Sequence, residues 1–81
     1  MEIKVLGTGC QKCKSLYKVV SEVVEENSIN AQVDKIEDIV EIMNYNILST
    51  PAMVIDGKVV LKGKVPSKEE ILKIINNENS R

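Results

Sequence analysis

The chain contains no histidine, tryptophan or phenylalanine, and its only aromatic residues are Tyr17 and Tyr45. The absence of histidine excludes the activation of a cysteine by an imidazole, and it excludes every mixed Cys/His zinc site. Two aromatic rings are too few for the stacking surfaces that bind single-stranded nucleic acids. The core must therefore be built from aliphatic side chains, chiefly those of Ile, Val and Leu.

An excess of one charge and a long apolar run are also missing. Eleven Lys and Arg residues against twelve Asp and Glu residues give a net charge of −1, so neither nucleic acid nor a membrane is an expected partner. No apolar stretch approaches the roughly 20 residues that span a bilayer, and no basic-then-apolar signal segment opens the sequence. We therefore expect a cytoplasmic monomer with a single domain over residues 1–81.

Cysteine is scarce as well, because the only two thiols are Cys10 and Cys13 in the stretch L-G-T-G-C-Q-K-C-K. A disulfide between them closes a tiny loop, so it gains far less than the ~3 kcal/mol expected for a fifteen-residue loop. In a reducing cytosol, a lone C-x-x-C indicates catalysis or metal binding rather than a structural crosslink.

Hydrophobic periodicity predicts the first half of the fold. Glu2–Leu6 alternates like a strand, and apolar residues then recur at the spacing of an amphipathic helix that should end near Glu26. A second strand is expected at Ala31–Asp34. Asp34 and Glu37 have the spacing of a capping box and would begin a second helix. The buried residues expected for the two helices are Leu16, Val19, Val20, Val23 and Val24, then Ile36, Ile39, Val40 and Met43.

The second half should contain a hairpin and a final helix. Ala52–Ile55 and Lys58–Leu61 flank Asp56-Gly57, a strong hairpin signal. Ser67 is the expected N-cap of the last helix, with Ile71, Leu72, Ile74 and Ile75 on its buried side and a fraying tail from Asn76. The order is β-α-β-α-β-β-α, an α/β fold with a four-stranded mixed sheet flanked by three helices.

The cysteine pair is expected where the first strand ends and the first helix begins. Free N–H groups and the positive end of the helix dipole would face Cys10 and favour its thiolate, whereas Cys13 would be shielded one turn inside the helix. This spacing suggests that Cys10 attacks a disulfide and that Cys13 resolves the mixed disulfide. Lys12, Lys14 and Lys18 would strengthen the positive potential, although lysines here are equally typical of a solvated face.

The glycines before the pair allow two interpretations. Gly7 and Gly9 match the start of a G-x-G-x-x-G dinucleotide loop, but the third glycine would fall at Lys12. We therefore expect Gly9 to leave space beside Cys10 for a partner, and Thr8 to help cap the helix.

With this C-x-x-C, the Thr50-Pro51 before a strand and the order of elements, the chain resembles the thioredoxin superfamily. It is most similar to small prokaryotic glutaredoxin-like redox-active disulfide proteins. The resemblance implies a protein disulfide oxidoreductase that needs no cofactor and no metal beyond its Cys10–Cys13 disulfide. It also implies a cis Pro51 beside the sulfurs, and a Thr50 backbone that pairs with the substrate.

Other positions follow from the same resemblance. Gly9, Gln11 and Lys12 would contact protein or small-molecule disulfide substrates. Lys4 stands where thioredoxins carry a buried acid, which leaves the proton acceptor for Cys13 open. The segment Gly63–Ser67 lacks the second Gly and the Asp of the glutathione-binding turn of glutaredoxins. A flavin-dependent reductase of the thioredoxin-reductase type is therefore the expected electron donor.

A Cu(I) carrier is the alternative function. Small copper-chaperone domains also place C-x-x-C between a first strand and a helix, and two thiolates suit linear Cu(I). Those domains, however, run β-α-β-β-α-β, end on a strand and carry Met where this chain has Thr8. The element order expected here favours the redox function.

Overall fold

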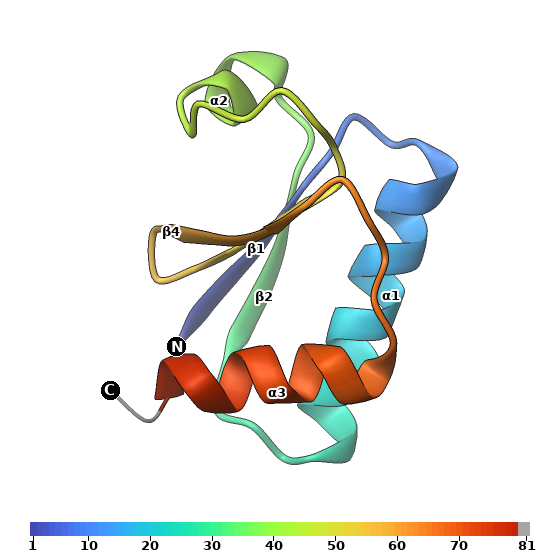
Figure 1. Cartoon of the computed structure of the whole chain (residues 1–81), viewed down its shortest axis with the longest axis vertical. Coiled ribbons are helices and arrows are strands. Elements are labelled where there is room, and N and C mark those ends of the chain that lie inside the picture. The colour runs from blue at the N-terminus through green and yellow to red at the C-terminus, as the bar shows by residue number, and fades with distance from the viewer. Residues whose placement is uncertain (80–81) are drawn as a thin grey trace.

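A computed structural model describes residues 1–79 and contains the predicted β-α-β-α-β-β-α order (Figure 1). Its elements are β1 (Glu2–Leu6), α1 (Gln11–Glu26), β2 (Gln32–Ile36), α2 (Ile39–Met43), β3 (Ala52–Ile55), β4 (Lys58–Lys62) and α3 (Lys68–Asn79). No helix within residues 1–79 is both long enough and apolar enough to cross a membrane.

The four strands form one mixed sheet in the order β2-β1-β3-β4. β1 pairs in parallel with β2 and antiparallel with β3, and β3 pairs antiparallel with β4. The parallel pair arises because α1 carries the chain back over the sheet, whereas the tight Asp56-Gly57 turn reverses it. The predicted sheet of four strands is confirmed.

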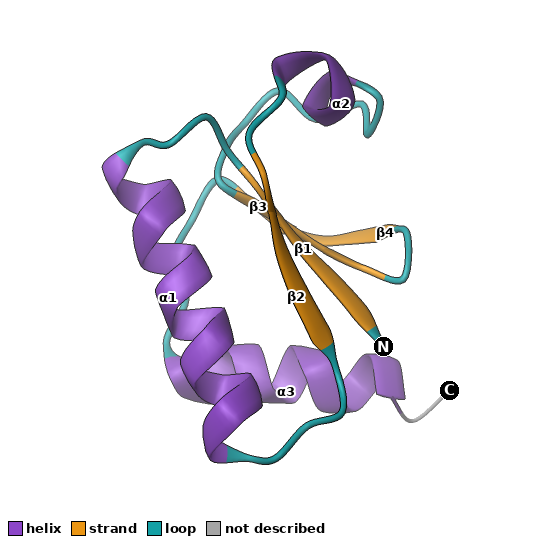
Figure 2. Ribbon diagram, turned by 180° about the vertical axis from the view of Figure 1, so that it is seen from behind, coloured by secondary structure: helices purple, strands orange, loops and turns teal. Residues whose placement is uncertain are grey.

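The helices cover the two faces of the sheet unequally. Helices α1 and α3 pack on one face, while the short α2 lies beyond the other face at the end where α1 begins (Figures 1 and 2). Successive strand residues point to opposite faces, so β1 contributes to both layers. Ile3 and Val5 pack with Leu16 and Val20 of α1, whereas Leu6 packs with Ile42 of α2.

Helix α1 follows its predicted stripe closely. Leu16, Val20 and Val23 are buried and Val19 and Val24 are partly buried, and the helix ends at Glu26 as expected. The N-cap differs from the expectation. It is Cys10 and not Thr8, because the Cys10 sulfur accepts the hydrogen bond from the Cys13 N–H.

The prediction for α2 is wrong in both its start and its buried face. Asp34 and Ile36 belong to β2, which stays paired with β1 as far as Ile36 opposite Leu6. The helix begins four residues later than a cap at Asp34 would place it, because Asp38 is the N-cap and its Oδ1 accepts the Val40 N–H at 3.0 Å. Its buried residue is Ile42, and the other three residues expected inside, Ile39, Val40 and Met43, are exposed.

The N-cap at Asp38 predicts that alanine substitutions at Asp38 and at Asp34 lower the free energy of unfolding by different amounts. Asp38→Ala should lower the free energy of unfolding by about 1 kcal/mol, the usual loss on removal of an N-cap side chain. Asp34→Ala removes only a hydrogen bond from the Gln32 side chain and should cost much less. Urea unfolding of the two variants measures the difference, and equal losses would contradict the position of the cap.

The last helix confirms its predicted cap but not its predicted end. The Ser67 hydroxyl accepts the Glu70 N–H at 3.3 Å, and the Glu70 carboxylate accepts the Ser67 N–H at 3.4 Å, which is a complete capping box. Ile71 and Ile75 are buried and Leu72 and Ile74 are partly buried. The tail expected from Asn76 is helical as far as Asn79.

Candidate active site

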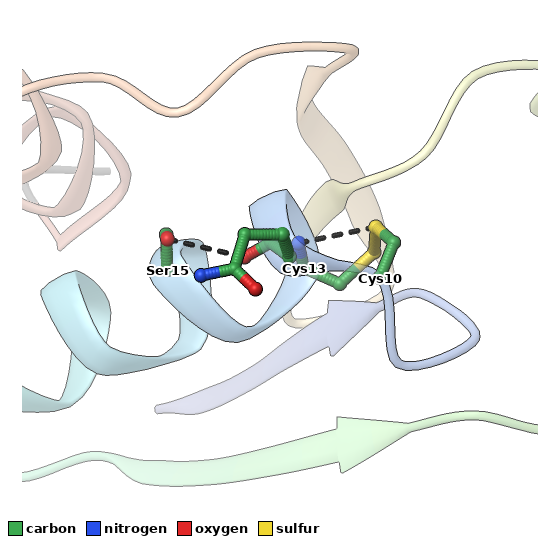
Figure 3. The surroundings of a disulfide bond; sticks show 4 residues. Cys10, Cys13 and Ser15 are labelled. Carbon is green, nitrogen blue, oxygen red and sulfur yellow. Dashed lines mark hydrogen bonds between the residues drawn. A yellow bond between two sulfur atoms is a disulfide. The ribbon is translucent and has the colours of Figure 1, made fainter.

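The two cysteines form a disulfide at the start of α1 (Figure 3). Their Cα atoms are 5.1 Å apart, within the normal range for such a bond. Cys10 has an extended backbone and serves as the N-cap, and its Sγ accepts the Cys13 N–H at 3.2 Å. One N–H of the first turn, that of Cys13, thus points at the sulfur of Cys10, where negative charge would be stabilised.

The two sulfurs differ in their access to solvent. Cys10 is exposed, whereas Cys13 is only 5% exposed and its side chain packs against Gly7. An incoming disulfide can therefore reach Cys10 first. Access to Cys13 requires that the substrate is already attached to its neighbour.

The charges within the first turns of α1 itself are positive, whereas the Glu37 carboxylate lies near Gly9 in the loop before the helix. The first turn contains no acidic residue, and Lys12 and Lys14 are exposed beside the disulfide. Gln11 is also exposed, and its carbonyl accepts the Ser15 hydroxyl at 3.1 Å, a contact drawn in Figure 3. This arrangement is electrostatically unfavourable for the helix but favourable for an anionic sulfur at its N-cap.

Gly7 has a role that the sequence interpretation missed. A Cβ atom at this buried position would lie 2.7 Å from Cys13 Cβ and would overlap Cys13 Sγ. The sulfur of Cys13 therefore rests directly on the Gly7 backbone, whose N–H is bonded to the Ile36 carbonyl at 2.9 Å. The sequence does contain one signal of this contact: Gly7 directly follows the first strand and precedes Cys10 of the C-x-x-C by three residues.

Gly7→Ala should lower the free energy of unfolding of the oxidised protein by about 2 kcal/mol, because overpacking a buried site costs ~1–3 kcal/mol. It should also change the rate at which dithiothreitol reduces the disulfide. Gly57→Ala is the control for the reduction rate: its φ of +85° makes an Ala there cost stability through backbone strain, but nothing lies within 4 Å of the added Cβ, so the reduction rate should not change. Urea unfolding and reduction kinetics that are unchanged for Gly7→Ala would contradict this contact.

Gly9 occupies a tighter place than expected. Its φ of +89° lies in the left-handed region that favours glycine. An added Cβ would lie 3.3 Å from Oε2 of Glu37, so a carboxylate borders the space expected to be open. Sequence reasoning placed Glu37 in the first turn of a helix, whereas it lies in the loop between β2 and α2 beside the disulfide loop.

Thr50 and Pro51 lie at the same end of the sheet as the disulfide. The Thr50–Pro51 peptide bond is cis, Pro51 is buried and Thr50 is exposed. The register of β1 and β3 ends with Leu6 opposite Ala52, so Pro51 and Gly7, on which the Cys13 sulfur rests, each lie one residue beyond this last pair. Within residues 1–79, the Thr50 backbone forms no hydrogen bond, whereas the Pro51 carbonyl accepts the Gly63 N–H at 2.8 Å.

Lys4 points away from the cysteines. Its neighbours Ile3 and Val5 pack beneath α1, so Lys4 lies on the opposite face of β1 and donates a hydrogen bond to the Tyr45 hydroxyl at 3.4 Å. That bond, together with nearby Glu2 and Glu41, raises the pKa of Lys4 above its usual value. The amine is therefore protonated at neutral pH and cannot accept a proton from Cys13.

Comparisons with known proteins identify the family of the chain. The profile of the family described as "Thioredoxin domain" matches residues 1–76. A protein named Thioredoxin from Methanothermobacter thermautotrophicus is 38% identical over 76 residues, which cover 94% of this chain and 99% of the relative. A Thioredoxin from Methanocaldococcus jannaschii is 42% identical over 69 residues, covering 85% of this chain and 79% of the relative.

Proposed function

Because the chain belongs to the thioredoxin-domain family of thiol–disulfide oxidoreductases, we propose that it reduces disulfides of other proteins through Cys10 and Cys13. The observation that carries the proposal is the asymmetry of the pair. Cys10 is exposed at the N-cap of α1, and Cys13 is buried behind it within bonding distance. This asymmetry supports a reaction of Cys10 with a partner and a reaction of Cys13 only with Cys10.

In the proposed reaction, the Cys10 thiolate bonds to one sulfur of the substrate disulfide. The substrate S–S bond breaks, and the departing thiolate takes up a proton. Cys13 then bonds to Cys10 Sγ and breaks the mixed disulfide, and its proton passes to the second substrate sulfur, which leaves as a thiol. Two electrons pass to the substrate and the Cys10–Cys13 disulfide remains. Lys4 is already protonated and cannot take up this proton. The second substrate sulfur, which leaves as Cys13 attacks, is therefore the proposed acceptor of the Cys13 proton.

The residues around the pair are proposed to hold the substrate chain. The unpaired backbone of exposed Thr50 can add an extended substrate segment as a strand beside the buried Pro51. Gln11 and Lys12 are exposed in the first turn of α1, directly after Cys10. Gly9 keeps the loop in its left-handed turn and adds no side chain of its own next to Cys10.

A flavin-dependent reductase is the proposed electron donor, acting in the cytoplasm. Glutathione recognition would require free polar groups in the turn before α3. The Ser67 hydroxyl and N–H are instead bonded to Glu70, and the turn lacks the aspartate of glutathione-binding proteins. These features support a protein reductant, and no metal or further cofactor enters the proposed reaction.

A trapping experiment tests this function. Reduced Cys13→Ser should accumulate a mixed disulfide through Cys10 with an oxidised protein substrate such as insulin, because the resolving thiol is gone. Cys10→Ser is the matched control and should trap nothing, since its remaining thiol is buried. If neither variant traps a partner while the reduced wild-type protein binds Cu(I) one-to-one through both sulfurs, the chain is a copper carrier and the proposal is wrong.

A further inference from the structure

A hollow lies along the edge of the sheet that β4 forms (Figure 1). Three parts of the chain line it: residues 45–47 after α2, residues 59–62 of β4 with the nearby Lys64, and Ile74 of α3. Its volume is about 530 Å³, within the ~300–1,000 Å³ that is typical of sites for small molecules. The lining contains neither cysteine and no other residue of the proposed redox site.

An irregularity in β4 shapes the apolar part of this hollow. The register passes from Leu61 directly to Val59 between successive residues of β3, so Val60 is an extra residue without a partner. Val59 packs against the core layer that contains α2, whereas Val60 packs against the layer that contains α1 and α3. Val59, Val60 and Ile74 are each only partly buried. The edge therefore offers a ligand aliphatic surface on both faces of the sheet.

The same edge is poorly suited to pair with a further strand. Lysines and bulges are the features by which proteins prevent the addition of a strand at a sheet edge. Lys58 and Lys62 lie at the two ends of β4, and the bulged Val60 lies between them. In an antiparallel pair of two copies centred on Val60, Lys58 of each copy would face Lys62 of the other. A small molecule is therefore a better occupant than an extended peptide or a second copy.

The ionic groups in the lining are two ammonium groups, those of Lys62 and Lys64, and no carboxylate. Lys64 Nζ lies 3.9 Å from the Glu70 carboxylate, and Lys58 is paired with Glu78 at 3.4 Å. Within residues 1–79, Lys62 has no ion pair. One unpaired positive charge thus remains in the lining, which favours a ligand with a single negative charge.

Another ionic group adjoins the hollow at Tyr45. The Lys4 ammonium donates a hydrogen bond to the Tyr45 hydroxyl at 3.4 Å, and Glu2 and Glu41 are the carboxylates near that ammonium. Neither carboxylate belongs to the lining. Because salt and water screen exposed charges that are not in contact, a ligand in the hollow would respond mainly to the two lysines that line it.

We propose that this hollow binds a small monocarboxylate with an aliphatic body, the chemistry of a medium-chain fatty acid. The carboxylate contacts Lys62 and Lys64, and the aliphatic chain lies on Val59, Val60 and Ile74. The site is separate from Cys10 and Cys13, so the inference goes beyond the proposed redox function and does not depend on it.

Titration of the oxidised wild-type protein with sodium octanoate, followed by ¹H–¹⁵N NMR at physiological ionic strength, tests the proposal. The shifts should saturate and should include amides of residues 59–64. Octanamide has the same chain without the charge and should bind about fivefold more weakly, as expected for one exposed ion pair. Butyrate should bind at least about tenfold more weakly than octanoate, because each buried CH₂ contributes about fourfold.

Variants of the lining complete the test. Lys62→Gln should weaken the binding of octanoate about fivefold and leave that of octanamide unchanged, since the amide makes no ion pair. Lys62→Gln together with Lys64→Gln should remove the preference for the carboxylate. Ile74→Ala should weaken both ligands by the same factor. Lys18→Gln is the matched control, because Lys18 is exposed on α1 outside the lining and should leave both affinities intact.

Several results would overturn the inference. Octanoate that does not bind, that binds no better than octanamide, or that keeps its preference in the double lysine variant would each exclude recognition of the carboxylate. Shifts confined to the exposed Ile39, Val40 and Met43 would show that the chain adheres to α2 instead. A dimer in sedimentation velocity with its interface at β4, or tighter binding of an extended acidic peptide than of octanoate, would assign this edge to a second copy or to a strand of another protein.

Discussion

In the fully reduced protein, iodoacetamide should modify Cys10 on the order of a hundredfold faster than Cys13 at neutral pH, because alkylation follows both thiolate content and exposure. Cys10 is exposed and caps α1, with Lys12 and Lys14 nearby and no acid in the first turn. Cys13 is 5% exposed and packs on Gly7. The two factors act in the same direction, so their effects multiply. Mass spectrometry of timed, quenched samples measures both rates in one experiment.

The single variants Cys10→Ser and Cys13→Ser provide the controls. Each leaves one thiol, so each rate can be measured without competition or disulfide formation. In concentrated urea the two rates should converge, because unfolding removes both the helix N-terminus and the burial. Similar rates in the folded protein would show that the helix does not distinguish the sulfurs, and the assignment of attacking and resolving roles would lose its basis.

The features that the sequence predicted well are local ones. The strand–helix junction at Cys10 and the stripe from Leu16 to Val23 each depend on residues within a few turns of one another. Hydrophobic periodicity and helix-capping motifs reflect such local preferences directly. The resemblance carried by Thr50-Pro51 added the cis bond that the structure contains.

The features that were missed depend on distant residues. Asp34 and Asp38 are both acceptable helix caps, and only the pairing of β2 with Leu6 decides between them. The contact of Gly7 with Cys13 and that of Glu37 with Gly9 arise from the way two loops meet at the end of the sheet. A local sequence pattern contains no information on contacts between loops that are distant in the sequence. The same error placed Ile39, Val40 and Met43 in the interior, although all three are exposed.

The same substitution at two leucines, one buried and one exposed, tests which of them belongs to the core. Leu16→Ala should lower the free energy of unfolding by about 3 kcal/mol, since Leu16 is fully buried and the deletion leaves a cavity. Leu48→Ala should change it by no more than about 0.5 kcal/mol, as for most surface substitutions. Urea unfolding of the oxidised proteins under identical conditions compares the two.

The loss at Leu16 should also reach the active site. Leu16 lies three residues after Cys13 on the same side of α1, so its packing against the sheet helps to hold the resolving sulfur in place. The total stability of a domain of this size is roughly 5–10 kcal/mol, so Leu16→Ala should leave a folded protein with easier local opening around Cys13. Faster alkylation of Cys13 at an unchanged Cys10 rate is therefore expected in Leu16→Ala, and not in Leu48→Ala. A variant that loses stability without exposing Cys13 would show instead that the Gly7 contact and the N-cap hold this sulfur without support from the core.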